Sequence, residues 1–135
     1  MRTALITTVT LAWILLIPVG ALGQDLGTWN ELKAFHTVMS QTFHPAEEGD
    51  FAPIKARSGE LLEKALAWQA SALPAEYQNV EDIETVLAAL VEGSKRLDAK
   101  VSAGAKNEEL AADLNALHNV FHKIVGLCKP GHGHH

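Results

Sequence analysis

The sequence predicts an all-α protein, an antiparallel up-down-up-down four-helix bundle that follows an N-terminal export signal. Three observations lead to this prediction. Beyond residue 23, apolar residues recur at intervals of three and four and almost nowhere alternate, which is typical of amphipathic helices. Proline, glycine and short polar links interrupt this pattern between the apolar segments. Four amphipathic helices with short connections bury their apolar faces most simply around one common axis.

The first two helices are predicted on either side of a polar link. The first begins at Thr28 or Asn30, either of which could cap it, and ends before Pro45, because proline drives its preceding residue out of the helical region. The second opens at Pro53, which suits a first helical turn, and closes before Pro74. Their apolar stripes are Leu32, Phe35, Met39 and Phe43 in the first, and Ile54, Ser58, Leu61, Leu62, Ala65, Leu66 and Trp68 in the second.

The third and fourth helices are separated by Gly104. The third begins near Asn79 and tolerates Gly93 in its interior at some cost in stability. The fourth begins at Asn107, a good N-cap that is followed by two glutamates in the favourable first turn, and continues to Gly126. Their apolar stripes are Val80, Ile83, Leu87, Leu90, Val91, Leu97 and Val101 in the third, and Leu110, Leu114, Leu117, Phe121, Ile124 and Val125 in the fourth.

Composition favours a single globular domain and excludes several classes of protein. The chain has 135 residues, of which 47% are hydrophobic and 20% charged, as in ordinary globular proteins. We divide it into a signal peptide over residues 1–23, a bundle over 24–128 and a flexible histidine-rich tail over 129–135. The formal net charge of −5 argues against nucleic-acid binding, which needs a cationic face. One cysteine and no Cys-x-x-Cys-His motif exclude an internal disulfide and a covalently attached haem.

The first 23 residues have the order of features found in export signals. A single cation, Arg2, precedes an apolar run over residues 11–17, and residues 21–23 form a small-residue cleavage site. An uncleaved anchor is the weaker alternative, because the apolar stretch over residues 4–19 is shorter than the roughly 20 residues that a membrane span needs. We therefore expect a periplasmic or secreted protein that has no membrane contact after cleavage.

Three histidines are predicted to share one site inside the bundle. His118 and His122 are four residues apart on the fourth helix, which is the spacing by which a helix presents two imidazoles to one metal ion. His36 lies within the apolar stripe of the first helix, which should run antiparallel to the fourth and place His36 at a similar depth. Three imidazoles would leave a fourth position open for water, a carboxylate or a ligand. The sequence therefore predicts an interior site for a transition-metal ion, namely copper, zinc or nickel.

The link after the first helix gathers a second group of potential ligands. One interpretation is a second metal site that combines an imidazole with three carboxylates. The other is a solvated loop, in which Arg57 pairs with the acids. The four candidate residues are His44, Glu47, Glu48 and Asp50.

The C-terminal tail could capture soft or borderline metal ions through a thiolate and several imidazoles. Its candidate ligands are Cys128, His132, His134 and His135. Cys128 leaves two further alternatives, which are a disulfide that joins two chains as a homodimer and a buried, inert thiol.

The fourth helix also carries a family resemblance. The run Leu-Asn-Ala-Leu-His-Asn-Val-Phe-His-Lys over residues 114–123 resembles the last helix of the periplasmic four-helix-bundle cytochromes, the soluble b-type cytochrome and cytochrome c-prime group. In that family the last helix supplies an axial histidine to haem iron, and His122 takes the matching position. The b-type members place an axial methionine on the first helix in a Leu-x-x-x-Met context, where this chain has His36, with Met39 one turn further. The resemblance implies a haem b protein with His122 and His36 or Met39 as axial ligands. The histidine at the methionine position and the additional His118 depart from the family pattern and point to a bare ion.

Three functions compete on these observations. The leading prediction is an exported metal-binding bundle that serves metal buffering, delivery or sensing. The alternatives are a haem-binding electron-transfer protein and an exported interaction module whose histidines serve packing or a pH response. We predict no enzymatic activity, because the sequence shows no nucleophile–base–orienter arrangement, phosphate-binding loop or paired acids at readable spacing.

Overall fold

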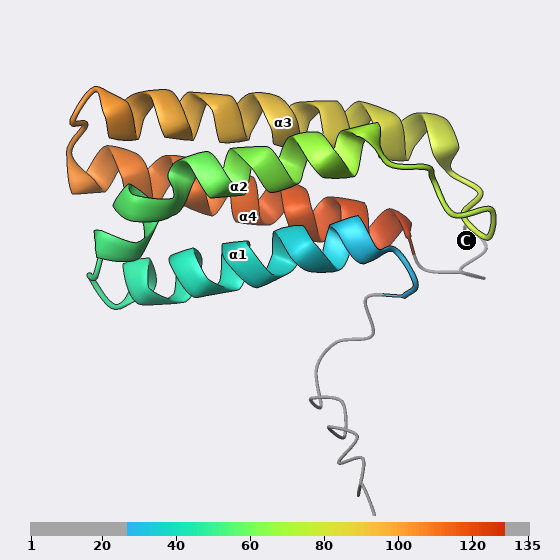
Figure 1. Cartoon of the computed structure of the whole chain (residues 1–135), viewed down its shortest axis with the longest axis horizontal. Coiled ribbons are helices and arrows are strands. Elements are labelled where there is room, and N and C mark those ends of the chain that lie inside the picture. The colour runs from blue at the N-terminus through green and yellow to red at the C-terminus, as the bar shows by residue number, and fades with distance from the viewer. Residues whose placement is uncertain (1–26, 129–135) are drawn as a thin grey trace, which may run out of the picture.

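The computed structural model describes residues 27–128, and this part of the chain folds into four helices joined by short links (Figure 1). Successive helices run in alternating directions, and residues 27–128 contain no strand, so the predicted all-α, up-down-up-down bundle is confirmed. The proposed signal peptide and the histidine tail lie outside the described residues. The helices are α1 (Asn30–Glu47), α2 (Ala52–Ala70), α3 (Val80–Ser102) and α4 (Asn107–Leu127).

The four helices do not pack equally closely. The pairs α1–α2, α2–α3 and α3–α4 make extensive contacts, whereas α1 and α4 touch at far fewer points. The first and last helices run antiparallel to each other (Figure 1). None of the helices within residues 27–128 combines the length and apolarity that crossing a membrane requires.

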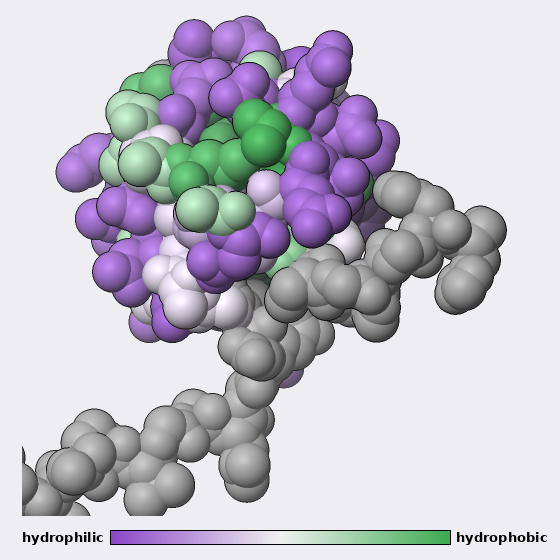
Figure 2. Space-filling view, turned by 90° about the vertical axis from the view of Figure 1, so that its right-hand side faces the viewer, coloured by the Kyte–Doolittle hydropathy of each residue, from purple (hydrophilic) through white to green (hydrophobic). Residues whose placement is uncertain are grey.

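Three aromatic rings from three helices form the centre of the core. Phe35 of α1, Trp68 of α2 and Phe121 of α4 are fully buried, and their ring centroids lie 5.6 to 6.1 Å apart. Viewed from the end at which α1 begins and α4 finishes, apolar residues gather in a central patch within a hydrophilic rim (Figure 2). Burial of the apolar stripes against one another is the main source of helix stability here, because propensity alone rarely sustains helices of this length.

Helix α1 continues past the point at which the sequence predicted its end. Pro45 lies inside the last turn, and α1 finishes at Glu47. Proline in a last turn removes a single intrahelical hydrogen bond, so this position costs less than one in the helix middle. The turn then closes through Asp50 N donating to Pro45 O over 2.9 Å, with Gly49 at a φ of +90°. The prediction that proline terminates the helix at His44 is therefore wrong.

Two of the predicted caps are also wrong. Neither Thr28 nor Asn30 caps α1, since Trp29 occupies that position without a side-chain cap bond and Thr28 Oγ1 donates instead to Glu76 Oε1 over 2.6 Å. Asn107 is the first helical residue of α4, and the extended Lys106 precedes it as the N-cap. The Lys106 backbone N–H donates to Glu109 Oε2 over 3.3 Å, so a first-turn glutamate takes the capping role that was assigned to asparagine.

Candidate metal site

The predicted histidines lie where α1 and α4 meet. His36 of α1 stacks on Phe121 of α4 with ring centroids 5.1 Å apart and planes 14° from parallel. His118 of α4 stacks on Phe43 of α1 at 3.9 Å and 8°. Each helix thus packs a histidine against a phenylalanine of the other, and these four residues together with His122 form what we call the α1–α4 seam. Helix α1 and helix α4 therefore place His36 and His118 at different levels, on two separate ring stacks.

The seam lies at the surface, so the prediction of an interior site is wrong. His122 is exposed, and His36 and His118 are half-buried. The reason is angular, because a residue that follows a core position is turned by about 100° around the helix axis. Phe35 and Phe121 point into the core, and the histidines that follow them are rotated to its edge.

His118 and His122 form a close pair on α4. Their Nε2 atoms lie 3.1 Å apart, their ring centroids 4.4 Å apart, and their planes are nearly perpendicular at 86°. At this distance the N–H of one ring donates to the bare nitrogen of the other, with the direction set by the tautomers. The two imidazoles therefore lie on one side of α4, as their spacing of four residues predicted.

The seam lowers the pKa values of His36 and His118. Burial is the largest cause that lowers the pKa of His118, followed by His122, while Glu47 acts in the opposite direction. The pKa of His36 is also lowered, first by burial and then by His122 and His44. Both imidazoles are therefore free bases at neutral pH, which is the form that binds a metal ion.

His36 does not join the pair. Its Nε2 lies 3.2 Å from Ser40 Oγ, one turn along α1, and its ring is held against Phe121. Within residues 27–128, no three histidine, cysteine, aspartate or glutamate side chains surround a common point that could hold a metal ion. The structure thus brings together two of the three predicted ligands and leaves the third beside them.

The second predicted group is spread along the end of α1. His44 Nδ1 lies 3.2 Å from Glu47 Oε2, and both side chains are largely exposed. Glu48 follows the helix as an exposed residue, and Asp50 Oδ1 accepts the backbone N–H of Ala52 over 3.0 Å at the start of α2. Of these four residues, only His44 and Glu47 therefore contact each other within residues 27–128.

The expected pairing of Arg57 with these acids does not occur. Arg57 Nε and Nη2 donate to the two carboxylate oxygens of Glu60 over 2.6 and 3.0 Å, and Nη1 donates to Gln41 Oε1 over 2.7 Å. Glu60 lies three residues further on the same helix, where a side chain can reach Arg57 without ordering a loop. The structure therefore contradicts the pairing of Arg57 with the acidic link, whereas the exposure of Glu47, Glu48 and Asp50 agrees with a solvated link.

Cys128 is buried at the end of α4, and the tail histidines His132, His134 and His135 lie outside the described residues. Burial raises the pKa of the Cys128 thiol to about 11. We therefore expect iodoacetamide at pH 8 to alkylate the folded protein at least about 100-fold more slowly than the unfolded protein, because the thiolate is the nucleophile. Mass spectrometry of timed samples with and without urea measures this ratio, since the chain has one cysteine. Equal rates would contradict the buried, inert thiol.

The residues of the haem alternative lie in different environments. Met39 is 1% exposed in the core, whereas His122 is exposed on the seam. Phe35 and Phe121 stack across the space between α1 and α4, at 5.9 Å. Haem binding through His122 with His36 or Met39 stays a prediction.

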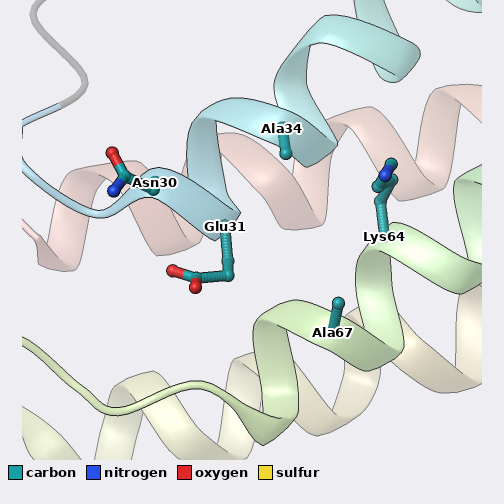
Figure 3. A pocket seen from close by; sticks show the side chains of 5 residues that line it. All are labelled: Asn30, Glu31, Ala34, Lys64 and Ala67. Carbon is teal, nitrogen blue, oxygen red and sulfur yellow. The ribbon is translucent and has the colours of Figure 1, made fainter.

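A cavity of about 250 Å³ lies elsewhere, between α1 and α2 (Figure 3). It is lined by one acid, one base and small or polar residues, and it contains none of the predicted ligands. A smaller hollow of about 80 Å³ adjoins the seam, beside Phe43, Glu47 and Asn115. The lining residues of the larger cavity are Asn30, Glu31, Ala34, Lys64 and Ala67.

The sequence carries a partial signal for the ring stacks of the seam. The chain contains the dipeptide Phe-His at residues 35–36, 43–44 and 121–122. All three phenylalanines are buried, and the rotation of about 100° per residue leaves His36 half-buried and His44 and His122 exposed. Which histidine meets which phenylalanine depends on the packing of α1 against α4.

Comparison of the chain with protein-family models, with curated proteins and with solved structures finds no match. Nothing in these comparisons bears on the resemblance to the four-helix-bundle cytochromes.

Proposed function

We propose that this protein is an exported metal-binding bundle, which holds a copper, zinc or nickel ion through His118 and His122 for metal buffering, delivery or sensing. The separation of the two Nε2 atoms, 3.1 Å, carries the proposal. Two nitrogens at 2.0–2.1 Å from one ion lie about 2.9 Å apart at a right angle and about 3.4 Å apart at the tetrahedral angle. The observed value falls between these limits, so the two nitrogens already have the separation that one ion requires.

The surroundings of the pair support this proposal. Stacking on Phe43 holds the His118 ring in place, which reduces the entropy that is lost when an ion orders a ligand. The lowered pKa of His118 keeps it unprotonated at neutral pH, and the exposure of His122 gives an ion a path from solvent. His36 lies on the neighbouring helix as the candidate third nitrogen, once its Nε2 leaves Ser40.

Calorimetric titration with Cu²⁺, Ni²⁺ and Zn²⁺ tests the proposal. The background variant replaces His132, His134 and His135 by alanine, so that the tail contributes no imidazole. We expect saturable binding that weakens at least about 100-fold in His118→Ala/His122→Ala, since even the loss of an outer partner of a ligand costs 10–100-fold.

The matched control is His44→Ala, which removes an exposed imidazole from the facing helix and should change the affinity by less than about threefold. His36→Ala is expected to weaken binding less than either single substitution on α4, because Nε2 of His36 is engaged with Ser40. Equal affinity in the background protein and in His118→Ala/His122→Ala would refute the proposal.

A further inference from the structure

The His118–His122 pair is an incomplete coordination sphere. A zinc ion takes four ligands in a tetrahedron, and Cu²⁺ takes four in a plane, whereas one α4 helix supplies two. Within residues 27–128, no third histidine, cysteine, aspartate or glutamate is placed to share an ion with the pair. Water could fill the remaining positions, but a protein that presents two ready nitrogens at its surface can also obtain two more from outside.

We infer that a second copy of this chain completes the site, so that one ion joins two α4 helices through His118 and His122 of each copy. This inference rests on the proposed function. Around a two-fold axis that passes through the ion, the same two residues of both copies meet, which gives four imidazole nitrogens from one self-complementary surface. The 3.1 Å separation within each pair is close to the edge of the tetrahedron that such a site needs.

The α4 surface around the pair carries few charges. The whole sequence carries a formal charge of −5, so two copies repel each other in general. On α4, however, the side chains that reach the surface between Glu109 and Lys123 include a single charged group, Asp113, whose Oδ2 lies 2.8 Å from Lys100 Nζ of α3. The remaining surface residues of this stretch are Ala111, Ala112, Asn115, Ala116, His118, Asn119, Val120 and His122.

A second α4 helix that approaches this stretch meets two acidic side chains, and each has a partner: Asp113 lies against Lys100, and Glu47 of α1, which acts on His118, lies against His44. Burial of an isolated charge is costly, and like charges across an interface reduce association. Asn115 and Asn119 flank the pair and are uncharged and short. An ion on the axis adds positive charge between two acidic chains, which further offsets their repulsion.

His36 is the competing source of nitrogen, and its contacts make it the less favourable one. To reach the ion it would give up both the stack on Phe121 and the contact with Ser40 Oγ. A second copy brings two nitrogens that are already spaced for one ion. The geometry therefore favours a shared ion over a three-histidine site within one chain.

Sedimentation velocity with increasing Zn²⁺ tests this inference, in the same background that lacks the tail histidines. A phosphine reductant keeps Cys128 reduced, so that no disulfide dimer contributes. We expect a monomer without metal and a dimer at half an ion per chain, which EDTA returns to monomer. His122→Ala should remain monomeric at every zinc concentration used.

A charge variant tests dimerisation independently of the histidine ligands. Asn119→Lys leaves all four histidines in place but sets two cations against each other across the axis, so its dimer should need at least about tenfold more protein. Gln69→Lys adds the same charge to an exposed position of α2 and should dimerise like the background protein.

The outcomes distinguish the two proposals. Saturable zinc binding at one ion per chain, by a protein that stays monomeric at all concentrations, would overturn the shared site and leave the proposed function standing. Absence of saturable binding to the histidine pair would overturn both. Equal dimerisation of Asn119→Lys and Gln69→Lys would place the contact away from α4 and so would also overturn the shared site.

Discussion

Trp68→Ala is expected to lower the free energy of unfolding by about 3–5 kcal/mol, the range for loss of a large aromatic side chain from a core. Trp68 is fully buried, and its ring contacts three other aromatic rings. These belong to Trp29, which immediately precedes α1, to Phe35 of α1 and to Phe121 of α4. Its removal therefore opens a cavity where three parts of the bundle meet. Urea unfolding followed by circular dichroism measures the change.

Trp68→Phe should cost much less than Trp68→Ala. The Trp68 Nε1 atom is buried without a hydrogen-bond partner among the described residues, so phenylalanine removes an unsatisfied donor while it keeps most of the ring. Gln69→Ala is the control at the exposed neighbouring position, and we expect it to change stability by less than about 0.5 kcal/mol. An equal loss in Trp68→Phe and Trp68→Ala would contradict this account of the core.

Gly93→Leu is expected to destabilise the bundle by about 1–3 kcal/mol, as is usual for overpacking of a filled core. Gly93 is buried in α3, and a β-carbon added there would lie 3.1 Å from Leu117 Cδ1 of α4. The remaining atoms of a leucine side chain must then displace α4, or the side chain must leave its preferred rotamer. A shift of the urea midpoint with an unchanged slope would measure the effect.

The same substitution at Gly59 provides the matched control. Gly59 is an exposed residue inside α2, and the nearest atom to an added β-carbon, Asp98 Oδ1, lies at an ordinary 3.8 Å. Gly59→Leu should therefore stabilise the protein by about 0.5–1 kcal/mol, through helix propensity alone. If Gly93→Leu also stabilises the bundle, α3 and α4 do not approach each other at Gly93 as described.

The presence of the four helices could be predicted from the sequence, because it depends on the local periodicity of apolar residues. Residues three and four apart share a face in any α-helix, so the stripes that include Leu32, Leu61, Leu90 and Leu114 were visible without coordinates, and all four residues are buried. Helix ends were less predictable, since several local solutions have similar free energies. Pro45 fits inside a last turn, and Glu109 caps α4 where asparagine was expected.

The candidate site, too, was predictable where it depends on one helix and unpredictable where it depends on the packing of two. The closeness of His118 and His122 follows from their spacing on one helix, so the sequence was sufficient to predict it. The position of His36 depends on how α1 is rotated and shifted against α4, which no local pattern contains. Its ring stacks on Phe121 instead of joining the pair.

The sequence by itself thus determined four amphipathic helices, their alternating order and one adjacent pair of imidazoles. Only the tertiary structure decided that the histidines lie at the surface, that the Leu117 side chain packs closely against Gly93, and that His118 stacks on Phe43. The physical reason is range. Hydrogen bonding and side-chain periodicity within a helix act over three or four residues, whereas the relative rotation of two helices is set by the packing of all the side chains between them.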